Sequence, residues 1–402
     1  MDFDWPGSND SRRLEIREWL SSHGNEPTQE QLARAGYVAP HWPKPYGMGA
    51  DPIHQLIIDE ELAAAGIKRA AGGIGLGWAG PTILYGGTIE QQERYLWPIL
   101  TGGEIWCQLF SEPDSGSDLA NLGTRAIRDG DRYIVNGSKI WSSGAHRSKF
   151  GILIARTDAD VAKHRGVSYF ICPMDAPGLE LHPIVDMTTA HSFNQTFFTE
   201  MELPVENRIG EENDGWRLAK VTLGNERVSL SGEGALWGSG PSANDLIEVI
   251  KNAGGIEDTI LRDKTSRLYI EGEILRLIRL RTLSARLNGR QPGPEASVRK
   301  ALADDHGKNI MGLAKDLSGT HGVLTDAGPL GQSPEFPVGQ SAVEGWNNWH
   351  GGFLFSPALT IGGGTSEVQR NIIAERVLGL PHDIDVQSGK SWLENRKDDR
   401  RL

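Results

Sequence analysis

TGGEIWCQLFSEPDSGSDLA, from Thr101 to Ala120, is the stretch at which the spacing of apolar and polar residues along the chain changes. Before it, apolar residues recur at helical intervals, as in DPIHQLIIDEELAAAGI from Asp51 to Ile67. After it, apolar and polar residues alternate over segments of strand length. The stretch therefore predicts a boundary near Ile105 between a helical region and a β region.

The β region is predicted to form a compact antiparallel domain. Its first segment, TRAIRDGDRYIVNGSKIWSSG, carries two turn signals, Asp129-Gly130 and Asn136-Gly137, and each is typical of a two-residue hairpin. Further segments of strand length follow, and the last one ends near MELPVENRIG at residues 201–210.

Helical periodicity returns at Gly215, in segments longer than the usual globular helix. Long antiparallel helices predict a bundle. Two helix starts carry capping boxes, Thr88 with Gln91 and Ser366 with Gln369. The long predicted helices cover residues 215–238, 259–288 and 295–319. The predicted layout is an N-terminal helical domain at 1–105, a central β domain at 106–213, a C-terminal bundle at 214–383 and a polar tail at 384–402.

Bulk properties narrow the class of protein. The 402 residues are enough for two or three domains with a large core. A formal charge of −12 argues against nucleic acid as the main partner, and charges interrupt every long apolar run, which argues against a membrane span. The N-terminus lacks a signal-peptide pattern, and two cysteines, Cys107 and Cys172, favour a reducing cytoplasm.

Four polar segments are candidates for chemistry, and each has a purely structural alternative. Residues 109–120, with Gly116 and several hydroxyls, suit a ring or phosphate, or form a serine-rich turn. Trp141 either forms one wall of a site for a flat cofactor or packs in the core. Glu226 is either a base inside the protein or a residue on a solvent-exposed helix face. The glycines of TIGGGTSEVQRN, residues 360–371, precede a predicted helix. The N-terminus of that helix either binds an anion or is an ordinary capped helix start.

Other common site motifs are missing from the sequence. The eleven histidines show no metal-ligand spacing, so no metal site is predicted. There is no GxSxG elbow, and the glycine triplet lacks the GK[ST] of a Walker loop. GLGWAG, from Gly75 to Gly80, has the letters of GxGxxG, but it lies among helical segments and not after a strand, so no Rossmann fingerprint is predicted.

Taken in order, the segments resemble the acyl-CoA dehydrogenase family over about residues 30–381. The resemblance rests on GYVAPHWPKPYG, GTIEQQERYLWPILTGGEIWCQLFSEPDSGSD, YIVNGSKIWSSGA, NERVSL and GGGTSEVQRNIIAERVLGLP. It implies an α+β multidomain fold with N-terminal helices, a central antiparallel β domain and a C-terminal four-helix bundle. It also implies FAD, and α,β-dehydrogenation of an acyl-CoA, with a carboxylate removing the α-proton while a hydride passes to flavin N5.

The resemblance assigns roles to residues that match the family's motifs. The residues that it places at the FAD are Leu109, Phe110, Ser111, Gly116, Ser117, Trp141, Ser143, Gly364, Thr365 and Glu367. Those that it places at the acyl-CoA are Ser117, Asn225 and Arg227.

Gly363 stands where many family members carry the catalytic glutamate of a Tyr-Glu-Gly-Thr loop. The loop therefore cannot supply a base. Other members, similar to the isovaleryl and long-chain types, place the glutamate on a bundle helix before an arginine, which is the position of Glu226. We predict Glu226 as the base, with the Gly363 N–H donating to the thioester carbonyl. Gly-Gly in place of Tyr-Glu also favours branched, bulky or longer acyl groups.

The resemblance implies electron-transfer flavoprotein as the electron acceptor, although an oxidase remains open, as does a DNA-associated relative. It implies a homotetramer, or a heterotetramer or dimer with a related chain. The family's Arg-x-x-Phe-Gly segment has no clear counterpart in residues 250–275, and DLSGTHG at 316–322 replaces its Gln-x-x-Gly-Gly. These departures keep a second hypothesis open, a non-catalytic or half-site subunit of a heteromeric complex.

Overall fold

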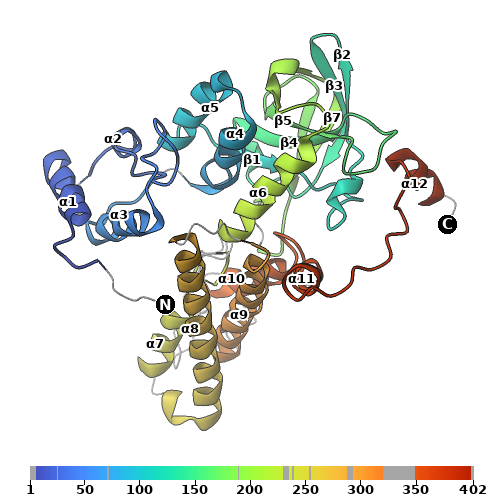
Figure 1. The fold of residues 1–402 in the computed structure, drawn as a ribbon. Coiled ribbons are helices and arrows are strands. Elements are labelled where there is room, and N and C mark those ends of the chain that lie inside the picture. Colours follow the sequence, from blue (N-terminus) through green and yellow to red (C-terminus); the bar gives the residue numbers. More distant parts are fainter. Residues whose placement is uncertain are drawn as a thin grey trace.

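The computed structural model describes residues 6–24, 26–69, 72–188, 190–229, 235–237, 240–252, 255–287, 293–319 and 349–399. Figure 1 shows three parts in chain order: blue helices, a green sheet region and a bundle coloured from yellow to red. The predicted α+β arrangement is confirmed.

The N-terminal part is helical, as predicted. Each of several helices begins at a side-chain cap, and the predicted capping box of Thr88 with Gln91 is confirmed at the start of α5. The helices are α1 (Ser11–His23), α2 (Gln29–Arg34), α3 (Pro52–Ala64), α4 (Gly80–Gly86) and α5 (Ile89–Thr101). A π-helical turn at Gly75–Ala79 leads into α4.

The central part is one eight-stranded sheet in the order β6-β7-β3-β2-β4-β5-β8, with β1 beside β4. Most pairs are antiparallel, while β1 runs parallel to β4. The predicted turn at Asp129-Gly130 is confirmed as the β2–β3 hairpin. The strands are β1 (Trp106–Leu109), β2 (Arg125–Asp129), β3 (Arg132–Lys139), β4 (Phe150–Arg156), β5 (Val167–Pro173), β6 (Leu179–Ile184), β7 (Phe193–Pro204) and β8 (Arg208–Ile209).

The predicted hairpin at Asn136-Gly137 is wrong, because both residues lie inside β3, where the pairing with β7 shifts register. Asn136 bonds through its side chain to Glu200 of β7 across this irregularity. A Cβ at Gly137 would lie 2.6 Å from the Thr124 hydroxyl oxygen. Glycine here permits a close approach inside the sheet and does not make a turn.

The C-terminal part is a helical bundle. The predicted helix 215–238 is wrong at its end, because residues 235–237 form a turn in which Trp237 has a φ of 50°. The helices are α6 (Gly215–Ser229), α7 (Ala243–Asn252), α8 (Thr259–Leu287), α9 (Ala296–Leu317), α10 (Trp349–Phe355), α11 (Ser366–Ile372) and α12 (Trp392–Asp399). The last of these lies in the predicted polar tail, beside the sheet and apart from the bundle (Figure 1).

Helix α6 ties the three parts together. The Thr222 hydroxyl lies 2.8 Å from the Thr82 hydroxyl on α4 and 2.9 Å from the Tyr169 hydroxyl on β5. All three side chains are completely buried. Further along the same helix, α6 packs against α9 of the bundle. The position of α6 is therefore determined by both the helical and the β part.

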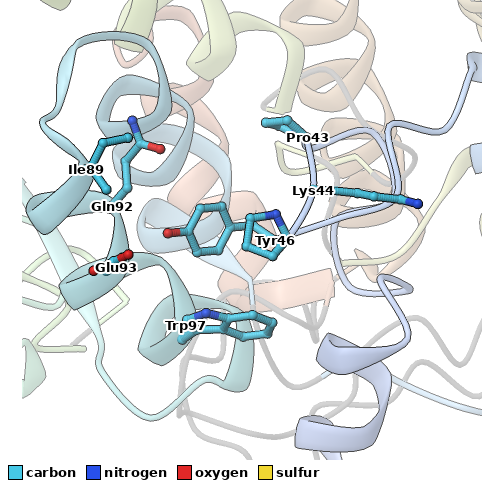
Figure 2. Close-up of a pocket in the computed structure, with 8 residues that line it drawn as sticks. Pro43, Lys44, Tyr46, Ile89, Gln92, Glu93 and Trp97 are labelled. Carbon is cyan, nitrogen blue, oxygen red and sulfur yellow. The ribbon is translucent and has the colours of Figure 1, made fainter.

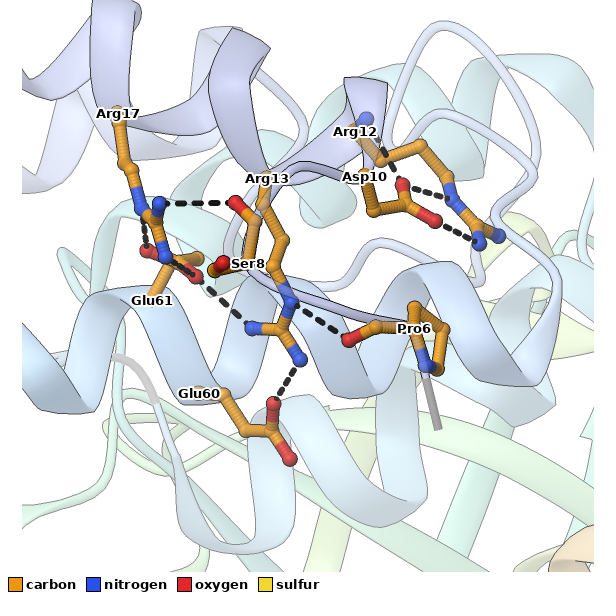
Figure 3. A network of polar contacts seen from close by, with 8 residues as sticks. All are labelled: Pro6, Ser8, Asp10, Arg12, Arg13, Arg17, Glu60 and Glu61. Atoms are coloured by element: carbon orange, nitrogen blue, oxygen red, sulfur yellow. Dashed lines mark hydrogen bonds and ion pairs between the residues drawn. The ribbon is translucent and has the colours of Figure 1, made fainter. Parts of the chain in front are cut away.

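An ion-pair network centred on the buried side chains of Arg13 and Glu61 joins α1 to α3 (Figure 3). Arg13 donates to Glu61 at 2.8 Å and to Glu60 at 2.5 Å, and Arg17 donates to Glu61 at 2.7 Å. Arg13 and Arg17 also donate to the carbonyls of Pro6 and Ser8. Hydrogen bonds from Arg17, opposed by burial and supported by Arg13, hold the pKa of Glu61 below its usual value.

Replacing Glu61 with Gln should lower the free energy of unfolding by about 2 kcal/mol at pH 7, because charge-assisted hydrogen bonds are lost. Since the folded-state pKa is lowered, the carboxylate stabilises the fold above its unfolded pKa of about 4.3. This contribution disappears as the pH falls through the folded value. Denaturant unfolding over a pH series should show the two proteins converging in acid. The control Glu30→Gln, in an exposed pair, should change little.

Candidate active site

Glu226 lies on α6 one turn after Thr222, and its side chain is only 6% exposed. The Gln108 amide on β1 donates to its carboxylate at 3.2 Å. Strand β1 continues directly into Leu109, Phe110 and Ser111. The predicted base is therefore held inside the protein, beside the strand that leads into the predicted flavin loop.

The loop after β1 is fixed by a buried ion pair that sequence reasoning missed. Lys139, with no exposed surface, donates to Glu112 at 2.8 Å and to the Phe110 carbonyl at 2.9 Å. Glu112 also accepts from the backbone N–H groups of Gly123 and Thr124. Burial raises the pKa of Glu112, but the Lys139 charge and the hydrogen bonds from Lys139, Gly123 and Thr124 together outweigh burial, so the pKa is lowered.

One signal for this pair was present in the sequence. Lys139 follows Tyr133 and Val135 at alternate positions, so it shares their inward-facing side once β3 runs unbroken through Asn136-Gly137, where a hairpin was predicted instead. A lysine on an inward face requires a carboxylate partner. The partner itself was not predictable, because Glu112 lies 27 residues away along the chain.

The end of β3 presents Trp141 to solvent. Its side chain is 56% exposed, its φ is 61°, and the ring of Phe193 packs edge-on against it at 5.8 Å between centroids. The next residue, Ser142, is held by backbone hydrogen bonds in both directions with Asn194. A rigid strand end thus carries an aromatic ring in a strained conformation, which is typical of a binding site.

The predicted capping box at Ser366 is wrong by one residue. The cap of α11 is Thr365, whose hydroxyl accepts from the Val368 N–H at 3.2 Å. Gly363 and Gly364 have φ values of 67° and 89°, so the chain turns before Ser366. The Gln369 amide does not close a capping box and donates instead to the carbonyls of Gly363 and Gly364.

The glycine turn rests on α9. Lys300, completely buried, donates to Asp304 on its own helix at 2.6 Å and to the Leu359 carbonyl at 3.3 Å. Leu359 belongs to the 3₁₀ helix Ser356–Thr360 that leads into the turn. Because α6 also packs against α9, this helix supports both Glu226 and the glycine turn.

Trp237 fills the space beside Gly362. A Cβ at Gly362 would lie 2.7 Å from the Trp237 ring, and that ring packs edge-on against Phe355 at 5.3 Å. The indole nitrogen of Trp237 is buried without a hydrogen-bond partner. The double glycine predicted additional space for the acyl group. Beside Gly362, the Trp237 ring occupies that space.

The remaining predicted residues differ in accessibility. Gly116 and Ser117 are exposed on the loop after β1, whereas Ser111 and Ser143 are half-buried. Leu109 and Phe110 are core side chains, so only their backbone can serve a ligand.

Asn225 donates to the Val221 carbonyl of its own helix. Glu367 is exposed near Arg370, and the side chain of Arg227 lies outside the described structure.

A separate cavity of about 430 Å³ lies among the N-terminal helices (Figure 2). It contains none of the residues predicted for the site, so it is not part of the candidate active site. Its lining residues are Pro43, Lys44, Pro45, Tyr46, Ile89, Gln92, Glu93 and Trp97.

Within the described ranges, no cluster of three potential metal ligands is found. The helices of the same ranges include none that is long and apolar enough to cross a membrane. Cys107 and Cys172 are both buried and free, as expected from a sequence without a disulfide framework.

Family models match all three parts of the chain. Residues 12–103, 107–202 and 213–378 match the N-terminal, middle and C-terminal domains of acyl-CoA dehydrogenase. Among solved structures, one described as the Tcur3481-Tcur3483 steroid ACAD has a TM-score of 0.73 and 27% identity, covering 95% of this chain and 100% of that chain. The ChsE4-ChsE5 complex from Mycobacterium tuberculosis has a TM-score of 0.72 and 30% identity, with coverage of 95% and 100%.

Two curated relatives come from Mycobacterium tuberculosis (strain ATCC 25618 / H37Rv). Acyl-CoA dehydrogenase FadE34 is 40% identical over 357 residues, 89% of this chain, which spans only 46% of that relative's length. Acyl-CoA dehydrogenase IpdE1 is 34% identical over 380 residues, 94% of this chain and 91% of the relative. With all three family domains matched in order, the chain belongs to the acyl-CoA dehydrogenase family of flavin-dependent oxidoreductases.

Proposed function

We propose that this protein is an FAD-dependent acyl-CoA dehydrogenase that converts an acyl-CoA thioester to the trans-2-enoyl-CoA, with Glu226 as the base. The observation that carries the proposal is the placement of Glu226. Its carboxylate is buried beside Gln108 on the strand that enters the predicted flavin loop. The family turn that often supplies a carboxylate has Gly363 instead.

The residues present fit FAD. Trp141 offers an exposed aromatic face, as a planar ring system requires. In the glycine turn, the Gln369 side chain is 1% exposed, and its amide oxygen has no hydrogen-bond partner among the described residues, which leaves an acceptor for a hydroxyl or amide of a ligand. Ser111, Ser143, Gly364 and Thr365 would complete the contacts. When bound, FAD supplies the hydride acceptor for the β-carbon.

The chain's own residues account for the proton chemistry. Glu226 would accept the α-proton, and its burial excludes water that would compete for it. The α-carbon becomes acidic enough only when the thioester carbonyl is polarised. The Gly363 N–H, in a turn held by the Gln369 side chain, is the proposed donor to that oxygen. Electron-transfer flavoprotein is the proposed acceptor of the electrons.

Glu226→Gln should keep its flavin and lose α-proton abstraction by about 10²–10⁴-fold, because the amide cannot act as a base. Anaerobic bleaching of the flavin by an acyl-CoA measures this step directly. The matched control is Glu211→Gln, just before α6, where the side chain is 92% exposed and the rate should not change. Full bleaching by Glu226→Gln would remove Glu226 from the mechanism.

The proposed acyl group is branched, bulky or ring-bearing. Support comes from the similar structure that is described as a steroid ACAD. Because Trp237 occupies the space beside Gly362, any additional room has to lie at Gly363 and beyond.

Across a panel of thioesters, branched and steroid side-chain acyl-CoAs should bleach the flavin about tenfold or more faster than a short straight chain, because only they fill a wide pocket. Anaerobic stopped-flow absorbance gives these rates. A preference for the straight short chain would refute the bulky-substrate proposal and leave the role of Glu226 intact.

A second candidate function is a half-site or non-catalytic subunit of a heteromeric dehydrogenase. It is favoured by the two structural relatives, which are described as pairs of differently named chains. The protein expressed alone should bind about one flavin per chain if it forms complete sites with copies of itself. Flavin absorbance and native mass spectrometry measure this ratio. A substoichiometric flavin content that rises with a related chain supports the heteromer.

A further inference from the structure

We propose that helix α12 is a latch that holds the loop of residues 112–124, and that Trp392 is the positioning residue through which it acts. The proposal rests on the proposed function only in the role of Ser117, which lies on this loop and is expected to contact the acyl-CoA. The contacts themselves belong to the fold. They join the C-terminal end of the chain to the loop that follows β1.

Trp392 is seated in the β part of the protein. Its indole N–H donates to the Asn121 carbonyl at 3.2 Å, and its backbone N–H donates to the Val161 carbonyl at 2.8 Å. The next residue, Leu393, donates from its backbone to Ala159 at 3.0 Å. Only 8% of Trp392 is exposed. The start of α12 is thus fixed against both the loop and the β4–β5 connection.

Arg156 transmits this contact to the loop. Its guanidinium lies 4.6 Å from the centre of the Trp392 ring, a cation–π distance. The same group donates to the carbonyls of Ala120 at 2.7 Å and Leu122 at 3.1 Å. Burial lowers the pKa of Arg156 to about 10, so the group stays charged at neutral pH. Removing the Trp392 ring would therefore remove the packing on one face of the Arg156 guanidinium, the group that holds this loop.

The loop has further anchors besides Trp392 and Arg156, and one comes from α12 itself, because a Cβ at Gly123 would lie 2.8 Å from the Arg396 guanidinium. Glu112 accepts from Gly123 and Thr124, and Lys163 pairs with Asp118 at 2.8 Å. These contacts leave the exposed tip, with Gly116 and Ser117, between two anchored ends. The latch therefore controls the orientation of the tip and not the existence of the loop.

Helix α12 can leave its seat without disturbing the bundle. The connection from α11 is exposed, with Ile384 at 91% and Val386 at 79%. Figure 1 shows this red segment running from α11 to α12 beside the sheet. Ser391 and Glu394 form a reciprocal cap that starts the helix locally. A short, separately capped helix on an exposed connection is a unit that opens locally.

The test compares Trp392→Ala with Trp392→Phe and with the control Leu393→Ala, a side chain 36% exposed on the same helix. Hydrogen exchange of amides 114–123 should increase in Trp392→Ala while α1–α5 and the bundle stay unchanged. The dissociation constant of coenzyme A, measured by calorimetry, should rise about tenfold from the loss of one cation–π contact and one hydrogen bond. KM should rise with it, while kcat and flavin content stay nearly constant.

Trp392→Phe keeps a ring over Arg156 and should restore most of the affinity, which a purely structural defect would not predict. Unchanged exchange at 114–123 in Trp392→Ala would overturn the latch. Faster exchange with unchanged coenzyme A affinity and KM would overturn the positioning role. If no acyl-CoA is turned over at all, the proposed function fails, and the exchange result still decides the latch.

Discussion

The buried pair of Lys139 and Glu112 is the interaction on which the candidate site depends. Taking a lysine and a glutamate out of water is costly, and it is tolerated here because the two charges pair with each other and each also bonds to the backbone. Lys139 binds both the carboxylate and the Phe110 carbonyl, while the carboxylate binds two backbone N–H groups. Lys139 thereby holds both ends of the loop after β1: directly at the Phe110 carbonyl, and through Glu112 at Gly123 and Thr124.

Helix α6 is the second constraint, because it carries Glu226 between the sheet and the bundle. The hydroxyl cluster of Thr222, Thr82 and Tyr169 fixes its rotation, and one turn later Gln108 meets the carboxylate. Helix α9 supports α6 and, through Lys300, the approach to the glycine turn. The proposed base and the proposed oxyanion donor are thus held by one common neighbour, as a preorganised site requires.

Local signals in the sequence predicted most elements and several details of the fold. The Thr88 cap and the Asp129-Gly130 hairpin were predictable because each depends on residues three or fewer apart. Asn136-Gly137 carried the same local signal and failed, because the pairing with β7 and the contact with Thr124 outweigh turn propensity. The cap at Ser366 failed by one residue, because Gly363 and Gly364 turn the chain earlier.

By itself, the sequence determined the order of helical, β and helical parts, since this order follows from the periodicity of apolar residues along the chain. The missing carboxylate at Gly363 and the candidate base Glu226 were implied by the resemblance of its motifs to those of the family. Only the tertiary structure decided which side chains meet. Gln108 and Glu226 are 118 residues apart, and Trp392 and Asn121 are 271 apart. Periodicity and capping act over a few residues, whereas such pairs form only when the chain is packed. For that reason the structure, and not the sequence, revealed the buried ion pair, Trp237 beside Gly362 and the seat of α12.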